Sequence, residues 1–295
     1  VASGEYLLAV DGRDVTTASS VYSFFEARAG KQVALRVGPN ANGDGARTVV
    51  VVPVPSESGL RTFAWVEDNR RKVSQMTGGR VAYIYMPDTS FGGYTNFNRY
   101  FYAQVNKSAA IIDERFNGGG MLATDIVETL SRKPLSRVAT RDGEDELQPQ
   151  GAIFGPKVMI INEFAGSGGD AMPWYFRRAG VGPLVGKRTW GGLVGRAGAP
   201  ALMDGGFVSS PSSAVWDPSQ SKWIAENVGI EPDVEVEQDP EAVRQGKDPQ
   251  LEKAVEIVMA ELAKAPRSQP KRPAFPNYQR PGGPPTGDTA NAVRK

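Results

Sequence analysis

Three short apolar segments, separated by helical patterns, constrain the fold of this 295-residue chain more than any other feature. They read RVAYIYM at residues 80–86, AAIID at 109–113 and KVMIIN at 157–162. Runs of this length with few polar positions are typical of strands that are buried on both faces of a parallel sheet. Strands that alternate with helices predict an α/β domain.

Apolar residues at intervals of three and four predict the helices that connect and follow these strands. We expect the helices at residues 94–105, 120–131, 171–178 and 248–262. The α/β domain is therefore predicted to occupy residues 56–264. Beyond it the chain is rich in proline and keeps no apolar periodicity, so residues 265–295 are predicted to be a disordered tail.

The first 55 residues show a different pattern, which predicts a small β/α domain over residues 1–55. Residues 6–10 place Tyr6, Leu8 and Val10 on one face, and a turn at Asp11-Gly12 follows, which predicts a strand. Apolar residues at helical spacing predict a helix over residues 17–29. Two valine-rich segments, at residues 32–37 and 48–54, predict a hairpin-like pair of strands.

The composition argues against several classes of partner and cofactor. The 34 basic and 33 acidic residues are not gathered into long runs, so we expect neither a nucleic acid nor a membrane as partner. The chain contains no cysteine and no histidine, which excludes disulfides and removes the usual ligands of zinc. We therefore expect no metal site and no cofactor.

Two glycine-rich segments follow predicted strands, at the strand ends where α/β proteins build their sites. The first is FNGGG at residues 116–120. Glycines leave backbone N–H groups uncovered, which an oxyanion hole requires, although a tight turn into the next helix is the simpler explanation of this segment taken alone.

The second segment is NEFAGSGGD, at residues 162–170. A serine between a strand and a helix projects its hydroxyl from the end of the sheet, near the positive end of the helix dipole. Ser167 is therefore a candidate nucleophile, but with Asp170 it also matches a capping box at the start of a helix. Backbone donors and a hydroxyl at neighbouring strand ends together favour acyl transfer.

Several stretches resemble, in the same order, the S41 family of serine peptidases and within it the tricorn type. They are GEYLLAVDGRDV, GGRVAYIYMPD, DERFNGGG, NEFAGSGGDAMPWYFRRAG, GPLVGKRTWGG and WIAENVGIEPDVEVEQDP, between residue 4 and about residue 240. The resemblance implies a ClpP/crotonase-like α/β core domain preceded by a PDZ-like domain, which we expect to be incomplete at its N-terminal side.

The resemblance also implies roles for individual residues. It makes Ser167 the nucleophile that forms an acyl-enzyme, and it makes the backbone N–H groups of Gly168 and Gly120 the oxyanion hole. Glu226 matches the acidic residue that orients the general base. The acidic segment at residues 142–146 includes two candidates for substrate binding, Asp142 and Glu144, whose alternative interpretation is a solvated charged loop.

The general base is missing from the sequence. One branch of the family carries a lysine in a T-x-G-K stretch, but here the stretch reads TWGG and has Gly192 in place of that lysine. Lys187 is nearby, yet a solvated lysine is a poor base. The tricorn type uses a histidine upstream of the PDZ domain. We therefore expect the base to lie outside this sequence and the 295-residue chain alone to be inactive or nearly so.

Two other functions remain open at this point. A non-catalytic binding or scaffold protein with the S41 fold would need no histidine, and a crotonase-type acyl-CoA enzyme would share the core and the oxyanion hole. The PDZ-like domain favours recognition of a polypeptide, by addition of a strand. The resemblance implies peptide substrates, a homo-oligomer and a cytoplasmic location.

Overall fold

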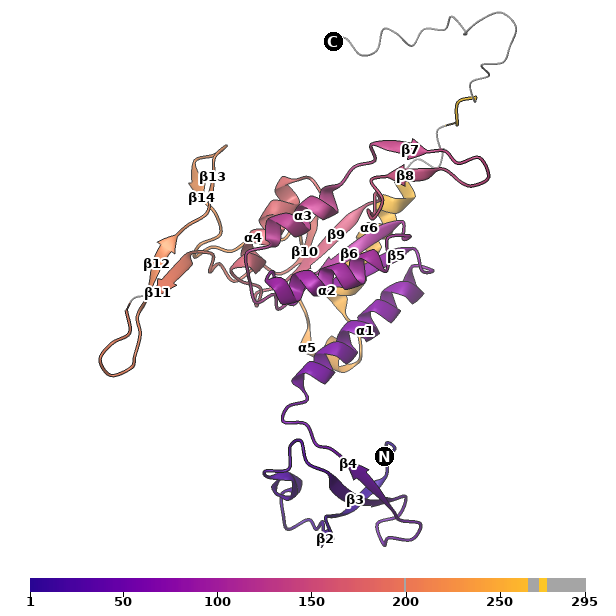
Figure 1. The fold of residues 1–295 in the computed structure, drawn as a ribbon, viewed down its shortest axis with the longest axis vertical. Helices are drawn as coiled ribbons and strands as arrows, with labels where there is room; N and C mark the ends of the chain where they lie inside the picture. The colour runs from indigo at the N-terminus through magenta and orange to yellow at the C-terminus, as the bar shows by residue number, and fades with distance from the viewer. Residues whose placement is uncertain (199, 265–270, 275–295) are drawn as a thin grey trace, which may run out of the picture. The chain divides into compact units, whose positions relative to one another are not determined.

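The structure, a computed structural model, describes residues 1–198, 200–264 and 271–274. It divides into two compact units, of which the first is Val1–Asp68 and the second begins at Asn69 (Figure 1). The division falls inside helix α1 (Ser58–Met76). The predicted tail lies largely outside the described residues. In the part of the chain that is described, no helix is both long and apolar enough to cross a bilayer.

The first unit is built on an antiparallel sheet with the strand order β2-β1-β3-β4. Its strands are β1 (Tyr6–Val10), β2 (Arg13–Asp14), β3 (Val33–Gly38) and β4 (Arg47–Val51). Alternate apolar residues of β3 face a small core that also holds Val10 and Phe24. The three predicted strands are therefore present.

The prediction of a helix over residues 17–29 is wrong. The segment forms only a five-residue 3₁₀ helix, Val21–Phe25, and Ser20 at its start makes no side-chain cap. Two physical reasons account for this. Its valine, aromatic and serine residues are poor helix formers, and Phe24 alone is buried, so packing does not compensate.

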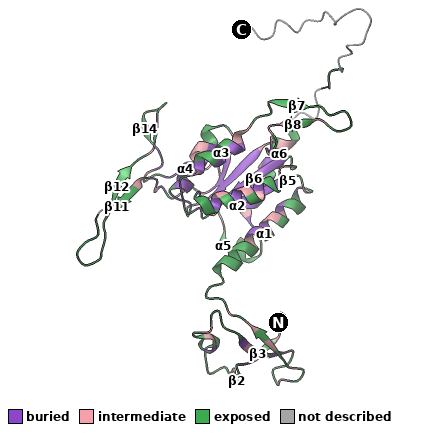
Figure 2. Cartoon of the chain, in the orientation of Figure 1, coloured by how far each residue is buried: buried purple, intermediate pink, exposed green. Residues whose placement is uncertain are grey.

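The second unit is built on a five-stranded sheet with the order β15-β10-β9-β6-β5, in which every pair is parallel. Its strands are β5 (Val81–Tyr85), β6 (Ala109–Asp113), β9 (Lys157–Ile161), β10 (Leu184–Gly186) and β15 (Val234–Glu235). Every residue of β5, β6 and β9 is buried (Figure 2). The predicted α/β architecture with a parallel sheet is confirmed.

Helices cover the sheet in the α/β manner (Figure 1). They are α2 (Phe91–Tyr102), α3 (Ala123–Ser131), α4 (Gly168–Arg178), α5 (Pro240–Arg244) and α6 (Pro249–Lys264). α2, α3 and α4 share one hydrophobic cluster with alternate residues of the strands, among them Ile84 and Ile112. α6 packs against β6, β9 and β10. This layering places the ends of the strands at one edge.

Three small antiparallel ribbons complete the unit. They are β7–β8 (Ser136–Val138 and Glu146–Gln148), β11–β12 (Gly195–Gly198 and Ser209–Ser213) and β13–β14 (Trp216–Asp217 and Lys222–Trp223). α3 begins later than the sequence predicts, at Ala123, because Gly119 and Gly120 have φ values of +88° and +141°, which no helix contains. These glycines form a loop at the site described next.

Candidate active site

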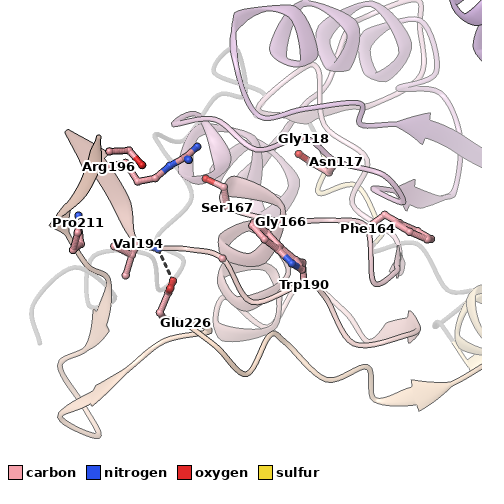
Figure 3. A pocket seen from close by; sticks show the side chains of 12 residues that line it. Asn117, Gly118, Phe164, Gly166, Ser167, Trp190, Val194, Arg196, Pro211 and Glu226 are labelled. Carbon is pink, nitrogen blue, oxygen red and sulfur yellow. Dashed lines mark hydrogen bonds between the residues drawn. The ribbon is translucent and has the colours of Figure 1, made fainter. Parts of the chain in front are cut away.

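A pocket of about 630 Å³ opens at the carboxyl ends of the parallel strands (Figure 3). The loop after β6 supplies Gly118, and the loop after β9 supplies Ser167. The complete lining is Asn117, Gly118, Phe164, Gly166, Ser167, Trp190, Gly192, Val194, Arg196, Ser209, Pro211 and Glu226. The parallel sheet explains this convergence, since it brings strand ends that are distant in the sequence to one edge.

Ser167 lies on a strained turn directly before α4. Its φ is +56° and its ψ is −114°, in a region that residues with a side chain rarely adopt. The Asp170 carboxylate supplies its half of the predicted capping box, because it accepts the Ser167 N–H at 2.8 Å, while the Ser167 side chain makes no cap hydrogen bond. Ser167 therefore stands at the N-cap position of α4 and also lines the pocket.

The glycine loop lies directly against this turn. A Cβ at Gly119 would stand 2.7 Å from the Cβ of Ser167, and a Cβ at Gly168 would stand 2.7 Å from the backbone nitrogen of Gly120. Real Cβ atoms essentially never come so close to other atoms. The glycines are therefore required for contact between the two loops, and the two predicted oxyanion donors are neighbours.

The hydrogen bonds of the loop single out one of its glycines. The N–H of Gly118 donates to the Pro87 carbonyl and the N–H of Gly119 donates to Asn117 Oδ1, both at 2.9 Å. The N–H groups of Gly120 and Gly168, in contrast, donate to no described residue. These two free donors beside Ser167 are the pair that the sequence predicts for an oxyanion.

Glu226 lines the same pocket from a segment between β14 and β15. Its Oε2 accepts the N–H group of Leu193 at 2.8 Å and that of Val194 at 2.7 Å, and Figure 3 shows the bond from Val194. Its neighbours Ala225 and Asn227 both have left-handed φ values, 62° and 60°. This strained double turn directs the carboxylate toward the site.

Comparisons with known proteins show the family of this chain. The sequence model of peptidase family S41 matches residues 80–236, more than half of the chain, and the model of the tricorn protease PDZ domain matches residues 1–56. The chain belongs to peptidase family S41. Within this family, the predicted tricorn type is also confirmed.

The similar proteins are tricorn proteases. The chain is 36% identical over 276 residues to tricorn protease homolog 1 of Streptomyces coelicolor, which covers 94% of this chain and 26% of the relative. It is 35% identical to the tricorn protease of Thermoplasma volcanium, over 91% of this chain and 26% of that protein. The crystal structure of the tricorn protease superposes with a TM-score of 0.78 at 33% identity, over 88% of this chain and 25% of that one. The S41 chain thus spans about a quarter of the length of these relatives.

Two other predicted residues of the S41 chain lie elsewhere. Asp142 and Glu144 are in the loop of the β7–β8 ribbon, and Glu144 lines a different pocket, with Arg137, Asp145 and Leu147. Neither residue lines the Ser167 pocket. Their role in substrate binding stays a prediction.

The lysines of the S41 chain that have shifted pKa values do not serve Ser167. Lys187 hydrogen-bonds Glu235 and Glu237, at 2.7 and 2.8 Å, and these bonds raise its pKa. Burial lowers the pKa of Lys157 to about 8, but this lysine begins β9 and is thus at the opposite end of the strand from Ser167. Neither lysine lines the pocket.

The sequence did not indicate three features of the pocket. Phe164 and Trp190 expose large apolar surfaces in it, 65% and 69% of each residue. Arg196, on β11, points toward Ser167 and forms no ion pair with a described residue (Figure 3). The sequence GRAG at residues 195–198 has no clear strand pattern, so nothing local indicated that Arg196 lies in the pocket.

Proposed function

We propose that this chain carries the nucleophile, the oxyanion hole and the orienting acid of a serine peptidase of the tricorn type. One observation carries the proposal: Ser167, on a strained turn, lies beside two backbone N–H groups that donate to no acceptor among the described residues. An oxyanion hole needs donors that are already in place and unused. Membership of family S41 supports the same reaction class.

In the proposed reaction, the Ser167 hydroxyl attacks the carbonyl carbon of a peptide bond and its proton passes to a general base. The carbonyl oxygen becomes an oxyanion, which the N–H groups of Gly168 and Gly120 stabilise. The C–N bond then breaks, the base returns the proton to the leaving amine, and an acyl-enzyme remains on Ser167. Water hydrolyses this ester by the same steps.

We propose that the general base is a histidine outside residues 1–295, because these residues contain none. Hydrogen bonds to Glu235 and Glu237 raise the pKa of Lys187, which makes it a poorer base, and Lys187 does not line the pocket. Glu226 is suited to orient such a base, since its carboxylate is held at the wall of the same pocket. The 295-residue chain alone is then nearly inactive, since loss of the base typically costs several orders of magnitude.

Further proposals rest on the same resemblance to tricorn-type peptidases. Peptides or unfolded polypeptides are the substrates, the PDZ-like unit binds chains by strand addition, and the protein acts as a homo-oligomer in the cytoplasm. The second candidate function is a non-catalytic binding or scaffold protein. The absence of histidine from residues 1–295 favours it.

Hydrolysis of fluorogenic peptides tests the proposal. The native protein from its own cells should cleave them, and replacement of the nucleophile by S167A should abolish cleavage. The 295-residue chain should turn over at least about a thousandfold more slowly than the native protein. Rapid cleavage by the 295-residue chain would contradict the missing base. A native protein that binds peptides but never cleaves them would support the scaffold function.

A further inference from the structure

Asp170 is a fully buried carboxylate that accepts four hydrogen bonds. Its Oδ2 accepts the Ser167 N–H at 2.8 Å and the Gly192 N–H at 3.0 Å. Its Oδ1 accepts the Thr189 hydroxyl at 2.5 Å and the Gly191 N–H at 2.8 Å. None of its surface is exposed. A buried carboxylate with this many donors is held rigidly, because each lost bond would leave a polar group unsatisfied.

These bonds join the turn of Ser167 to the segment after β10. Residues 189–192 are separated from Asp170 by about twenty positions in the sequence, yet three of the four donors come from them. Gly191 and Gly192 lead directly to Leu193 and Val194, whose N–H groups bind Glu226. One carboxylate therefore fixes the start of the segment that holds the orienting acid.

Thr189 makes a second connection to the Glu226 segment. Its hydroxyl donates to Asp170 and accepts the N–H of Ile230 at 2.8 Å, while its own N–H donates to the Ile230 carbonyl at 3.1 Å. The Gly191 carbonyl also accepts the N–H of Asn227, next to Glu226, at 2.8 Å. Thr189 is 3% exposed, so water cannot replace these bonds.

We propose that Asp170 and Thr189 are positioning residues that hold Ser167, its oxyanion donor and Glu226 in one geometry. This inference rests on the proposed peptidase function. The Asp170 bond restrains φ at Ser167, and the following peptide unit carries the N–H of Gly168. A change at Asp170 therefore misdirects both the nucleophile and an oxyanion donor. The effect of a change at Asp170 also reaches Glu226 through Thr189, although Glu226 forms no hydrogen bond with Asp170 or Thr189.

The test compares T189V with T189S in the native protein. Valine keeps the shape of threonine but removes the hydroxyl, and serine keeps the hydroxyl. T189V should lower kcat about 10- to 100-fold with KM nearly unchanged, since small misplacements of reacting groups cost about this much. T189S should restore kcat to within about threefold of the unchanged protein, and D170N should be at least as impaired as T189V.

A matched control separates positioning from stability. Val258 is fully buried on α6, and it belongs to neither the Asp170 nor the Thr189 hydrogen bonds. V258A should therefore lower the melting temperature by leaving a cavity, and should leave those hydrogen bonds in place. If V258A keeps its kcat while T189V loses it at the same temperature below both melting points, the role is positioning. Equal kcat in T189V and the unchanged protein, or an equally low kcat in T189S, would overturn the inference.

Amide hydrogen exchange gives a readout that needs no activity. T189V should speed exchange in residues 189–194, which include the amides of Leu193 and Val194 that bind Glu226, and T189S should not. Unchanged exchange in T189V would overturn the inference even if the protein hydrolyses peptides. Faster exchange in a protein without peptidase activity would support the network and refute the proposed function separately.

Discussion

Replacement of Arg115 by methionine should destabilise the second unit strongly. Its guanidinium is almost completely buried and bonds Asp113 at 2.6 and 2.9 Å and Asp248 at 2.9 and 3.0 Å. These bonds tie the end of β6 to the start of α6, directly before the FNGGG loop. Methionine fills a similar volume but leaves two buried carboxylates without their cation.

The expected loss follows from the cost of an unpaired buried charge. Removal of one partner of a buried ion pair costs about 3–5 kcal/mol of unfolding free energy. For a unit of this size, that corresponds to a fall in melting temperature of roughly 6–20 °C. Urea unfolding at pH 7 gives the free energy and calorimetry gives the melting temperature.

The unfolding free energy lost in R115M should depend on pH. Burial acts to raise the pKa of Asp248, but the charge and hydrogen bonds of Arg115 outweigh it and hold the pKa below its ordinary value. A lowered pKa contributes stability above the unfolded value of about 3.9, and this stability is lost as the pH falls through the folded value. R115M removes the contribution, so its deficit should be large at pH 7, still large at pH 4, and smaller only at a pH below the folded pKa of Asp248.

Two control variants bracket the result. R115K keeps a charge but cannot fork to both carboxylates, so its loss should be intermediate. R141M removes the same charge from an exposed loop and should have almost no effect. A deficit in R115M below about 1 kcal/mol, or one that does not shrink when the pH falls below the folded pKa of Asp248, would refute the reasoning.

Three further substitutions have defined outcomes. In G168A the new Cβ would stand 2.0 Å from Thr89 Oγ1 and 2.7 Å from the Gly120 nitrogen, so kcat of the native protein should fall more than about a hundredfold; unchanged kcat would place the oxyanion elsewhere. Burial and two neighbouring carboxylates raise the pKa of Glu114 well above its ordinary value. This carboxyl keeps its proton to a higher pH in the folded protein than in the unfolded chain, which ionises above about pH 4.3, so wild-type stability falls as the pH rises from there. E114Q should therefore equal the unchanged protein in urea unfolding near pH 4 and exceed it at pH 7, and the opposite trend would contradict a neutral Glu114. R196Q removes the cation that lines the pocket and should raise KM for peptides with acidic residues several-fold more than for neutral peptides, whereas equal effects on both would show that Arg196 does not select substrates.

Local patterns were sufficient where the structure depends on neighbouring residues. Strand β6 has the predicted bounds, Ala109–Asp113, because its side chains are apolar on both faces and only a buried strand accommodates them. The helix over residues 17–29 was wrong for the opposite reason, since its apolar spacing was not matched by burial. Helix α1 was not predicted because few of its residues are apolar and buried.

The sequence by itself determined the class of sheet, the turn that carries Ser167 and the glycine loop beside it, because strand and turn preferences act over a few residues. Only the tertiary structure decided what surrounds them. It brought Glu226 to backbone N–H groups 32 and 33 residues away and Asp170 to Thr189, 19 residues away. Such contacts depend on which strand ends meet at one edge of the sheet, and no local periodicity contains that information.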